Sequence, residues 1–105
     1  MTKKQMKENH YKVWKWIADH CHEYPEVHDN HKLKSLAFQA LGLGMIINNC
    51  FACEACDLIC EKCPCDWGDD MDHCEINGTP YMDFISSDNI KDKRKYALKV
   101  KKAWK

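Results

Sequence analysis

Residues 50–65 read Cys50-Phe51-Ala52-Cys53-Glu54-Ala55-Cys56-Asp57-Leu58-Ile59-Cys60-Glu61-Lys62-Cys63-Pro64-Cys65. Together with Cys74 they contain seven of the eight cysteines of the chain. Two thiolates separated by two residues can bind one metal ion from a single turn of backbone. Residues 50–75 are therefore expected to form loops that a metal ion organises, with little regular structure.

The preferred ion is one structural zinc, because Zn²⁺ accepts four thiolates in a tetrahedron. Two Cys-x-x-Cys pairs supply the first-choice ligands Cys50, Cys53, Cys60 and Cys63. The spacer between the pairs is shorter than the roughly 15–20 residues common in zinc ribbons, so Cys74 is a fifth candidate that can replace Cys50 or Cys60. Zinc in a small cysteine site is worth roughly 10–16 kcal/mol, so its removal is expected to unfold at least the central third of the chain.

An iron–sulfur cluster is the alternative metal group. The spacing Cys50-x-x-Cys53-x-x-Cys56-x-x-x-Cys60 matches the bacterial ferredoxin motif up to its last position. That motif continues with proline, whereas Glu61 follows Cys60 here. Disulfides are disfavoured because thiols stay reduced inside cells, although an even number of cysteines permits them.

The length of 105 residues fits one domain, residues 1–105, with a small core that a structural metal would support. The basic start Met1-Thr2-Lys3-Lys4 has no apolar run behind it, so no signal peptide is expected. The longest apolar patch, Met45-Ile46-Ile47, is far shorter than the ~18 residues of a membrane span. We therefore expect a cytoplasmic protein that makes no membrane contact. The sequence indicates no particular oligomeric state.

Apolar residues at intervals of three and four predict three helices, over residues 4–22, 31–42 and 88–104. Their apolar stripes are Met6, His10, Val13, Trp14, Ile17 and Cys21 in the first helix, Leu33, Leu36, Ala37, Ala40 and Leu41 in the second, and Ile90, Ala97, Val100 and Trp104 in the third. The expected boundary residues are Pro25 after the first helix, Asp29 or Asn30 before the second, Gly42 and Gly44 after it, and Ser87 or Asp88 before the third.

Two short β elements are expected between these helices. Residues 45–49 are predicted to enter the cysteine-rich segment as a short strand. Ile76-Asn77-Gly78-Thr79 contains the Asn-Gly pair that favours a tight hairpin turn, and Pro80 restricts the following strand to an edge. The predicted fold class is therefore mainly α, a small single domain with three helices, a zinc-organised cysteine-rich loop region and a short β-hairpin.

The remaining cysteines are interpreted as packing residues. Cys56 and Cys65 are surplus to a single zinc site and are expected to pack beside it, with a second metal or a redox thiol as the alternative. Cys21 is expected to lie packed in the apolar face of the first helix. Three histidines without partners at ligand spacing are expected in solvent: His28, His31 and His73.

No motif of a known catalytic site is present. The chain has no Gly-rich phosphate loop, no His-Glu-x-x-His helix and no Gly-x-Ser-x-Gly turn. The Pro64-Cys65 pair is not followed by a second cysteine at the spacing that a zinc deaminase needs. A zinc ion with four thiolates has no open coordination position. We therefore expect that the protein is not an enzyme and has no catalytic residues.

Charge is balanced overall but segregated along the chain. Sixteen basic and sixteen acidic residues give a net charge of zero, which argues against a general nucleic-acid binder. Apart from Lys62 the charged residues of 54–75 are acidic, and apart from Asp92 those of 91–105 are basic. The favoured interpretation is a solvated basic face, partly paired with the acidic loops. The alternative is a nucleic-acid contact made by Lys91, Arg94, Lys95, Lys99 and Lys102.

The cysteine-rich segment also resembles a known group. Cys50-Phe51-Ala52-Cys53-Glu54, then Cys60-Glu61-Lys62-Cys63-Pro64-Cys65-Asp66-Trp67-Gly68, then Cys74 is similar to small cysteine-rich proteins encoded by phages and prophages of Gram-positive bacteria. Those proteins tend to open with a Lys-rich helix carrying Trp-x-x-Ile/Leu-Ala, here Trp14 to Ala18. They tend to close with a charged helix that ends near a tryptophan, here Trp104.

The resemblance implies a zinc-binding phage protein in the cytoplasm of a bacterial host, and it implies no activity. In that group positions 56 and 65 usually carry other residues, which disfavours the ferredoxin interpretation. The recurrent cysteines of the group correspond to Cys50, Cys53, Cys60, Cys63 and Cys74.

These observations predict a non-enzymatic accessory or regulatory protein that binds a host or phage macromolecule. Zinc would hold the shape of the loops, and the helices would present the contact surface. A protein partner is favoured because the net charge is zero. Nucleic-acid binding through the basic C-terminal helix is the second hypothesis, and an iron–sulfur electron carrier is the third.

Overall fold

The computed structural model describes residues 2–44, 51–56, 64–66 and 78–104. Its α-helices are α1 (Lys3–His20), α2 (Asn30–Ala40), α3 (Phe51–Ala55), α4 (Pro80–Ser86) and α5 (Ile90–Ala103), and the 3-10 helix η1 (Cys21–Glu23) follows α1. None of these residues belongs to a strand, although Cys65 and Trp104 form an isolated antiparallel bridge. The predicted mainly α class is confirmed for this part of the chain.

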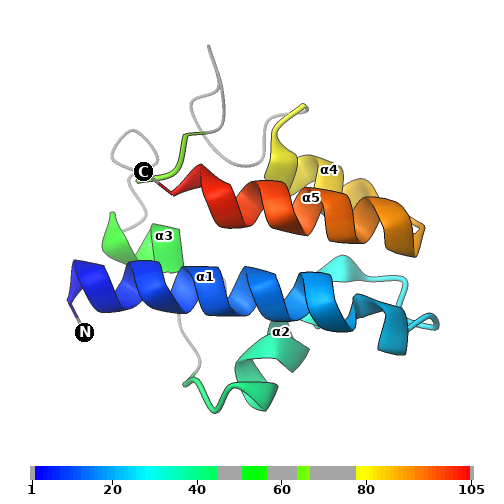
Figure 1. Ribbon diagram of the computed structural model, residues 1–105, viewed down its shortest axis with the longest axis horizontal. Coiled ribbons are helices and arrows are strands. Elements are labelled where there is room, and N and C mark those ends of the chain that lie inside the picture. Colours follow the sequence, from blue (N-terminus) through cyan, green and yellow to red (C-terminus); the bar gives the residue numbers. More distant parts are fainter. Residues whose placement is uncertain (1, 45–50, 57–63, 67–77, 105) are drawn as a thin grey trace.

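Helices α1 and α5 lie side by side, run in opposite directions and share the most extensive contact between described elements (Figure 1). Helix α4 packs on α5, whereas α2 and α3 pack on α1. Four of these helices contribute large, fully buried side chains, which are Ile17 from α1, Leu33 and Phe38 from α2, Phe84 from α4 and Val100 from α5. Helix α3 lies against the N-terminal half of α1, near the C-terminal end of α5 (Figure 1).

Helix α1 begins with a capping box. The backbone N–H of Gln5 donates to the Thr2 hydroxyl (3.1 Å), and the Thr2 N–H donates to Gln5 Oε1 (2.8 Å), so two N–H groups without helical partners are satisfied. The predicted apolar stripe is buried from His10 to Cys21. The predicted helix over 4–22 is therefore confirmed as α1 followed by η1, which ends before Pro25.

Helix α2 has a side-chain cap at its start and a glycine at its end. The His31 N–H donates to the carboxylate of Asp29 (3.0 Å), one of the two predicted caps. Beyond the last turn, Gly42 has a φ of 69° and the Leu43 N–H donates to the Phe38 carbonyl (2.9 Å). This is a Schellman motif, in which the left-handed position favours glycine.

The predicted apolar stripe of α2 is confirmed in part. Leu33 and Ala37 are buried, but Ala40 is exposed because it lies in the last turn, beyond the core. Phe38, which was not part of the predicted stripe, is buried instead.

Residues 80–86 form helix α4, so the edge strand predicted after Pro80 is wrong. The Met82 N–H donates to the Thr79 hydroxyl (3.2 Å), and Pro80 occupies the first helical turn, where its missing N–H is not needed. Gly78, with a φ of 96°, precedes this cap. The turn residues 76–77 and the strand predicted over 45–49 lie outside the described residues.

Helix α5 confirms the predicted C-terminal helix with two corrections. Its cap is Asn89, whose side-chain oxygen accepts from the Asp92 N–H (2.9 Å), and not Ser87 or Asp88. Ile90 was predicted in the apolar seam but is 36 % exposed, because the first turn of α5 buries the side chain of Lys93 instead. The other predicted seam residues are buried: Ala97, Val100 and Trp104.

Candidate functional site

Both ends of the cysteine-rich stretch 50–65 are attached to the helical core. At the start, the α3 residues Phe51 and Ala52 are buried, and the Phe51 ring stacks on Phe38 with centroids 5.3 Å apart and planes 8° from parallel. Within residues 50–75, where little regular structure was predicted, α3 is a helix of five residues, and most of the remaining segment lies outside the described residues. Five residues are too few to be helical in isolation, so packing on α1 holds this helix.

At the end of the stretch, Cys65 pairs with Trp104 just beyond α5. The Asp66 N–H donates to the Ala103 carbonyl (2.7 Å), which satisfies one of the carbonyls that a helix leaves unpaired at its C-terminus. The Trp104 ring lies 5.2 Å from the ring of His10 in α1. The chain after the cysteine pairs is therefore attached at the junction of α1 and α5.

His10 ties these two helices together at the same junction. Its Nε2–H donates to the Val100 carbonyl (2.9 Å), and the side chain is 3 % exposed. Burial lowers the pKa of His10 to about 4, although its bonds to the Val100 and Lys101 backbone act in the opposite direction. The imidazole is thus neutral at pH 7, and its one N–H lies on Nε2, where it donates to the Val100 carbonyl.

The predicted metal ligands fall largely outside the described residues. Cys53 belongs to α3, but its side chain is outside the described part, as are Cys50, Cys60, Cys63 and Cys74. Within residues 2–44, 51–56, 64–66 and 78–104, no group of three His, Cys, Asp or Glu side chains is placed to hold a metal ion. The ligand set therefore stays a prediction.

The cysteines predicted to pack are buried. Cys56 and Cys65 are both buried, and Cys21 lies in the core with its thiol 3.9 Å from the Ala18 carbonyl that it points to. Burial raises the pKa of the Cys21 thiol, so it stays protonated at neutral pH, whereas metal binding requires the thiolate. His28 and His31 are exposed as predicted, and His73 is outside the described residues.

The predicted nucleic-acid contact residues are brought together by α5. Lys91, Arg94, Lys95, Lys99 and Lys102 are all exposed, and at 100° per residue they occupy one arc of roughly 140° around the helix. The buried residues of α5 lie on the opposite side. We call this set the basic face.

Two lysines, Lys34 and Lys93, are buried. Lys93 is 5 % exposed and its Nζ donates to the Val27 carbonyl (3.0 Å). Lys34 donates to the Tyr81 hydroxyl (2.8 Å), with its Nζ 4.9 Å from the centre of that ring. The long aliphatic stems of lysine can complete an apolar surface while the ammonium finds an oxygen. Both positions lie within the apolar stripes of their helices, because Lys34 precedes Ala37 by three residues and Lys93 precedes Ala97 by four. This spacing is the signal in the sequence that could have indicated their burial.

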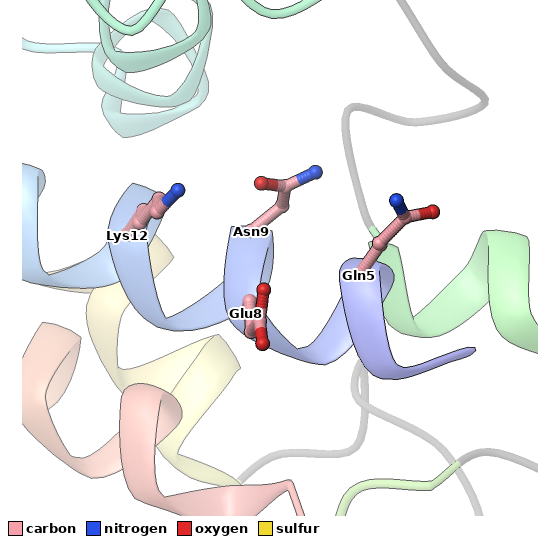
Figure 2. A pocket seen from close by; sticks show the side chains of 4 residues that line it. All are labelled: Gln5, Glu8, Asn9 and Lys12. Carbon is pink, nitrogen blue, oxygen red and sulfur yellow. The ribbon is translucent and has the colours of Figure 1, made fainter. Parts of the chain in front are cut away.

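A polar hollow of about 460 Å³ lies beside the N-terminal half of α1. The hollow is lined by four side chains that all project from this helix, Gln5, Glu8, Asn9 and Lys12 (Figure 2). None of the four is buried. The hollow is thus open helix surface and lacks the apolar walls of a ligand pocket.

In the described part of the chain, no helix combines the length and the apolar character that a membrane span requires. Comparison with protein-family models found no match, and searches of characterised proteins and of solved structures found no similar protein.

Proposed function

We propose that this chain is a non-enzymatic structural-zinc protein of phage or prophage type, which binds a host or phage protein as an accessory or regulatory factor. The observation that carries the metal part is the attachment of the cysteine-rich stretch at both ends. Phe51 packs at its start, and Cys65 and Asp66 are tied to the end of α5. Both attachments lie near one end of the α1–α5 pair (Figure 1).

A metal ion is proposed because the attachments are weak by themselves. Helix α3 has five residues, and a single bridge with one backbone hydrogen bond contributes on the order of 1 kcal/mol. Zinc bound by cysteines contributes roughly 10–16 kcal/mol in apparent terms. Cys53 and Cys63 would hold it, together with two of the three residues Cys50, Cys60 and Cys74. The ion would act as a structural crosslink with all positions filled by sulfur.

The partner is proposed to be a protein because the chain is neutral overall. The helices present a surface of mixed charge, whereas the ion stiffens the loops between them. The phage or prophage origin rests on the resemblance in the cysteine pattern. The accessory role rests on the same resemblance and on the lack of a known catalytic motif in the sequence.

Metal analysis combined with native mass spectrometry tests the first part. The expected result is one zinc ion per chain and a colourless protein. A brown protein that contains iron would instead support the alternative, an iron–sulfur electron carrier, and would show a reversible change in visible absorption on reduction.

Affinity capture from a nuclease-treated bacterial lysate tests the second part. The expected result is one partner protein at fixed stoichiometry. The capture should be lost when the zinc is removed before mixing. Recovery of nucleic acid alone would contradict the choice of a protein partner.

A further inference from the structure

The basic face of α5 carries no neutralising charge from the described residues. Lys91, Arg94, Lys95, Lys99 and Lys102 are exposed, and within the described ranges no carboxylate lies at ion-pair distance from any of them. The nearest acid in sequence, Asp92, instead accepts a hydrogen bond from the Asn89 side chain (2.9 Å) at the helix cap. The acidic side chains of 54–75 that were expected to pair with part of this face lie outside the described part of the chain, apart from that of Asp66, so that pairing stays a prediction.

The face has the length and the charge of a contact for a nucleic-acid backbone. Residues 91 and 102 are eleven positions apart, which is about 16 Å along a helix that rises 1.5 Å per residue. The major groove of B-DNA is about 12 Å wide and admits an α-helix. Cations at the two ends of the face can therefore reach phosphates on both sides of that groove.

The other side chains of α5 favour binding of a double strand over a single strand. They also favour contact with the phosphates over contact with the bases. Tyr96 is partly buried, and its ring is approached by the ammonium groups of Lys95 (5.3 Å) and Lys99 (5.4 Å). It is thus poorly placed to stack on the bases of a single strand. The only other residue within the arc is the partly buried Leu98, so the face has no Asn or Gln to read adenine.

We propose that the basic face binds the phosphate backbone of double-stranded DNA without strong sequence preference. Duplex RNA is the poorer fit because its major groove is too deep and narrow for side chains to enter. This inference goes beyond the proposed function, since it depends on neither the zinc nor the protein partner. The net charge of zero, which argues against a general nucleic-acid binder, does not oppose this binding, because the cations are gathered on one face of α5.

The test is fluorescence anisotropy of zinc-loaded protein with a labelled random-sequence DNA duplex between 50 and 200 mM salt. Up to five phosphate contacts give a slope of log K against log salt down to about −4.5. Replacing Lys91, Lys95 and Lys102 by Gln removes three contacts, which should reduce the slope by about 2.7 and weaken binding at least tenfold at low salt. The pair Arg94→Gln and Lys99→Gln should reduce the slope by about 1.8.

The matched control replaces Lys12, Lys15 and Lys32 by Gln. These lysines are equally exposed and lie on α1 and α2, so the change in net charge is the same. The control should bind within threefold of the unmodified chain. An equal loss in control and test variants would overturn the proposal, because net charge and not the face would then be responsible.

Three further results would overturn it: no binding of the duplex at 50 mM salt, equal or tighter binding of duplex RNA, or tighter binding of a polyglutamate peptide. The last of these would assign the face to an acidic protein. A second DNA duplex of unrelated sequence should bind with the same affinity within threefold, and a strong difference would contradict backbone recognition.

Discussion

The α1–α5 helix pair and the attachments of the cysteine-rich stretch are held in different ways. The pair buries a continuous seam from Val13 to Cys21 on one helix and from Ala97 to Trp104 on the other, with His10 bonded across it. The stretch is attached by one five-residue helix and one isolated bridge. The stretch also buries Phe51, Ala52 and Cys65, but over far fewer residues than the pair, and we propose that zinc crosslinks it. This difference is the physical basis for the proposed zinc.

The largest expected effect comes from removing a proposed ligand. Cys53→Ala should abolish zinc binding and unfold the cysteine-rich stretch, because it removes the roughly 10 kcal/mol of apparent stabilisation that the ion contributes there, whereas α1 and α5 should stay helical. Zinc content by native mass spectrometry and the thermal midpoint measure this. The matched control is Cys56→Ala in the same stretch. It should keep the zinc and lose about 1–2 kcal/mol, the usual cost of a single substitution.

Retention of zinc in the Cys53 variant would contradict the ligand set. Loss of the metal in the Cys56 variant would contradict it too, because Cys56 is required only by the ferredoxin-like spacing. The two variants therefore separate the two metal hypotheses.

Substitution of one phenylalanine in the helical core and one in the cysteine-rich stretch tests the difference between these regions. Phe84 is fully buried and its ring meets Trp14 edge to face at 5.0 Å, so Phe84→Ala should cost about 3–5 kcal/mol. The zinc affinity of the Phe84→Ala variant at 25 °C should equal that of the unmodified chain. Phe51→Ala removes the packing of α3 and should lower both stability and zinc affinity. Urea unfolding and competition with a zinc chelator measure the two quantities. Equal zinc affinity in both variants would show that α3 does not support the metal site.

Acid should weaken the helix pair through His10. The pKa of His10 in the folded chain is about 4, against an ordinary value of 6.5. The unfolded chain therefore binds the proton first, and stability falls as the pH drops from 6.5 to about 4, by roughly 3 kcal/mol in total. His10→Gln should remove this component of the pH dependence, whereas the exposed control His31→Gln should keep it. Chemical unfolding at pH 7 and pH 4.5 compares the three chains, and parallel curves for all of them would contradict the assignment.

The smallest expected effect concerns Asn30, which joins α2 to α4. Its Nδ2 donates to the carbonyls of Phe84 (2.7 Å) and Ser87 (2.8 Å), which lie at the C-terminal end of α4. Asn30→Ala removes the donor to the Ser87 carbonyl, whereas the Phe84 carbonyl still accepts from the Ser87 N–H (3.2 Å) and hydroxyl (2.6 Å). The loss of these bonds should cost about 1–3 kcal/mol. The control is the neighbouring Asp29, the exposed N-cap of α2. Asp29→Ala should cost about 1 kcal/mol. Thermal unfolding of both variants checks the order, and a larger loss for Asp29→Ala would contradict it.

The sequence predicts the helices whose stripes and caps are strong. Residues from Met6 to Cys21 recur at intervals of three and four, and Gly42 marks the end of α2 at a left-handed position. Helix α4 was predicted as a strand because the pair Asn77-Gly78 favours a hairpin turn. That signal was given more weight than the helix start at Thr79-Pro80. Thr79 as a cap followed by Pro80 is itself a helix signal. The burial of Lys34 and Lys93 was missed although both lie within the apolar stripes of α2 and α5, because a charged side chain by itself favours solvent.

The basic face is predicted from the sequence more completely than the metal ligands are. The basic face follows directly from the period of α5, so all five residues were predicted and are exposed together. The cysteine pattern indicates the metal but cannot select four ligands from five, because closure of the stretch depends on α3 and on the bridge to Trp104. Neither of these attachments has a local signal in the sequence.

Hydrogen exchange of the zinc-loaded and chelated protein, followed segment by segment, tests the central difference most directly. The predicted result is a large rise in exchange for residues 50–75 after chelation, with α1 and α5 still the slowest to exchange. Unchanged exchange in residues 50–75 after complete removal of the metal would contradict the account.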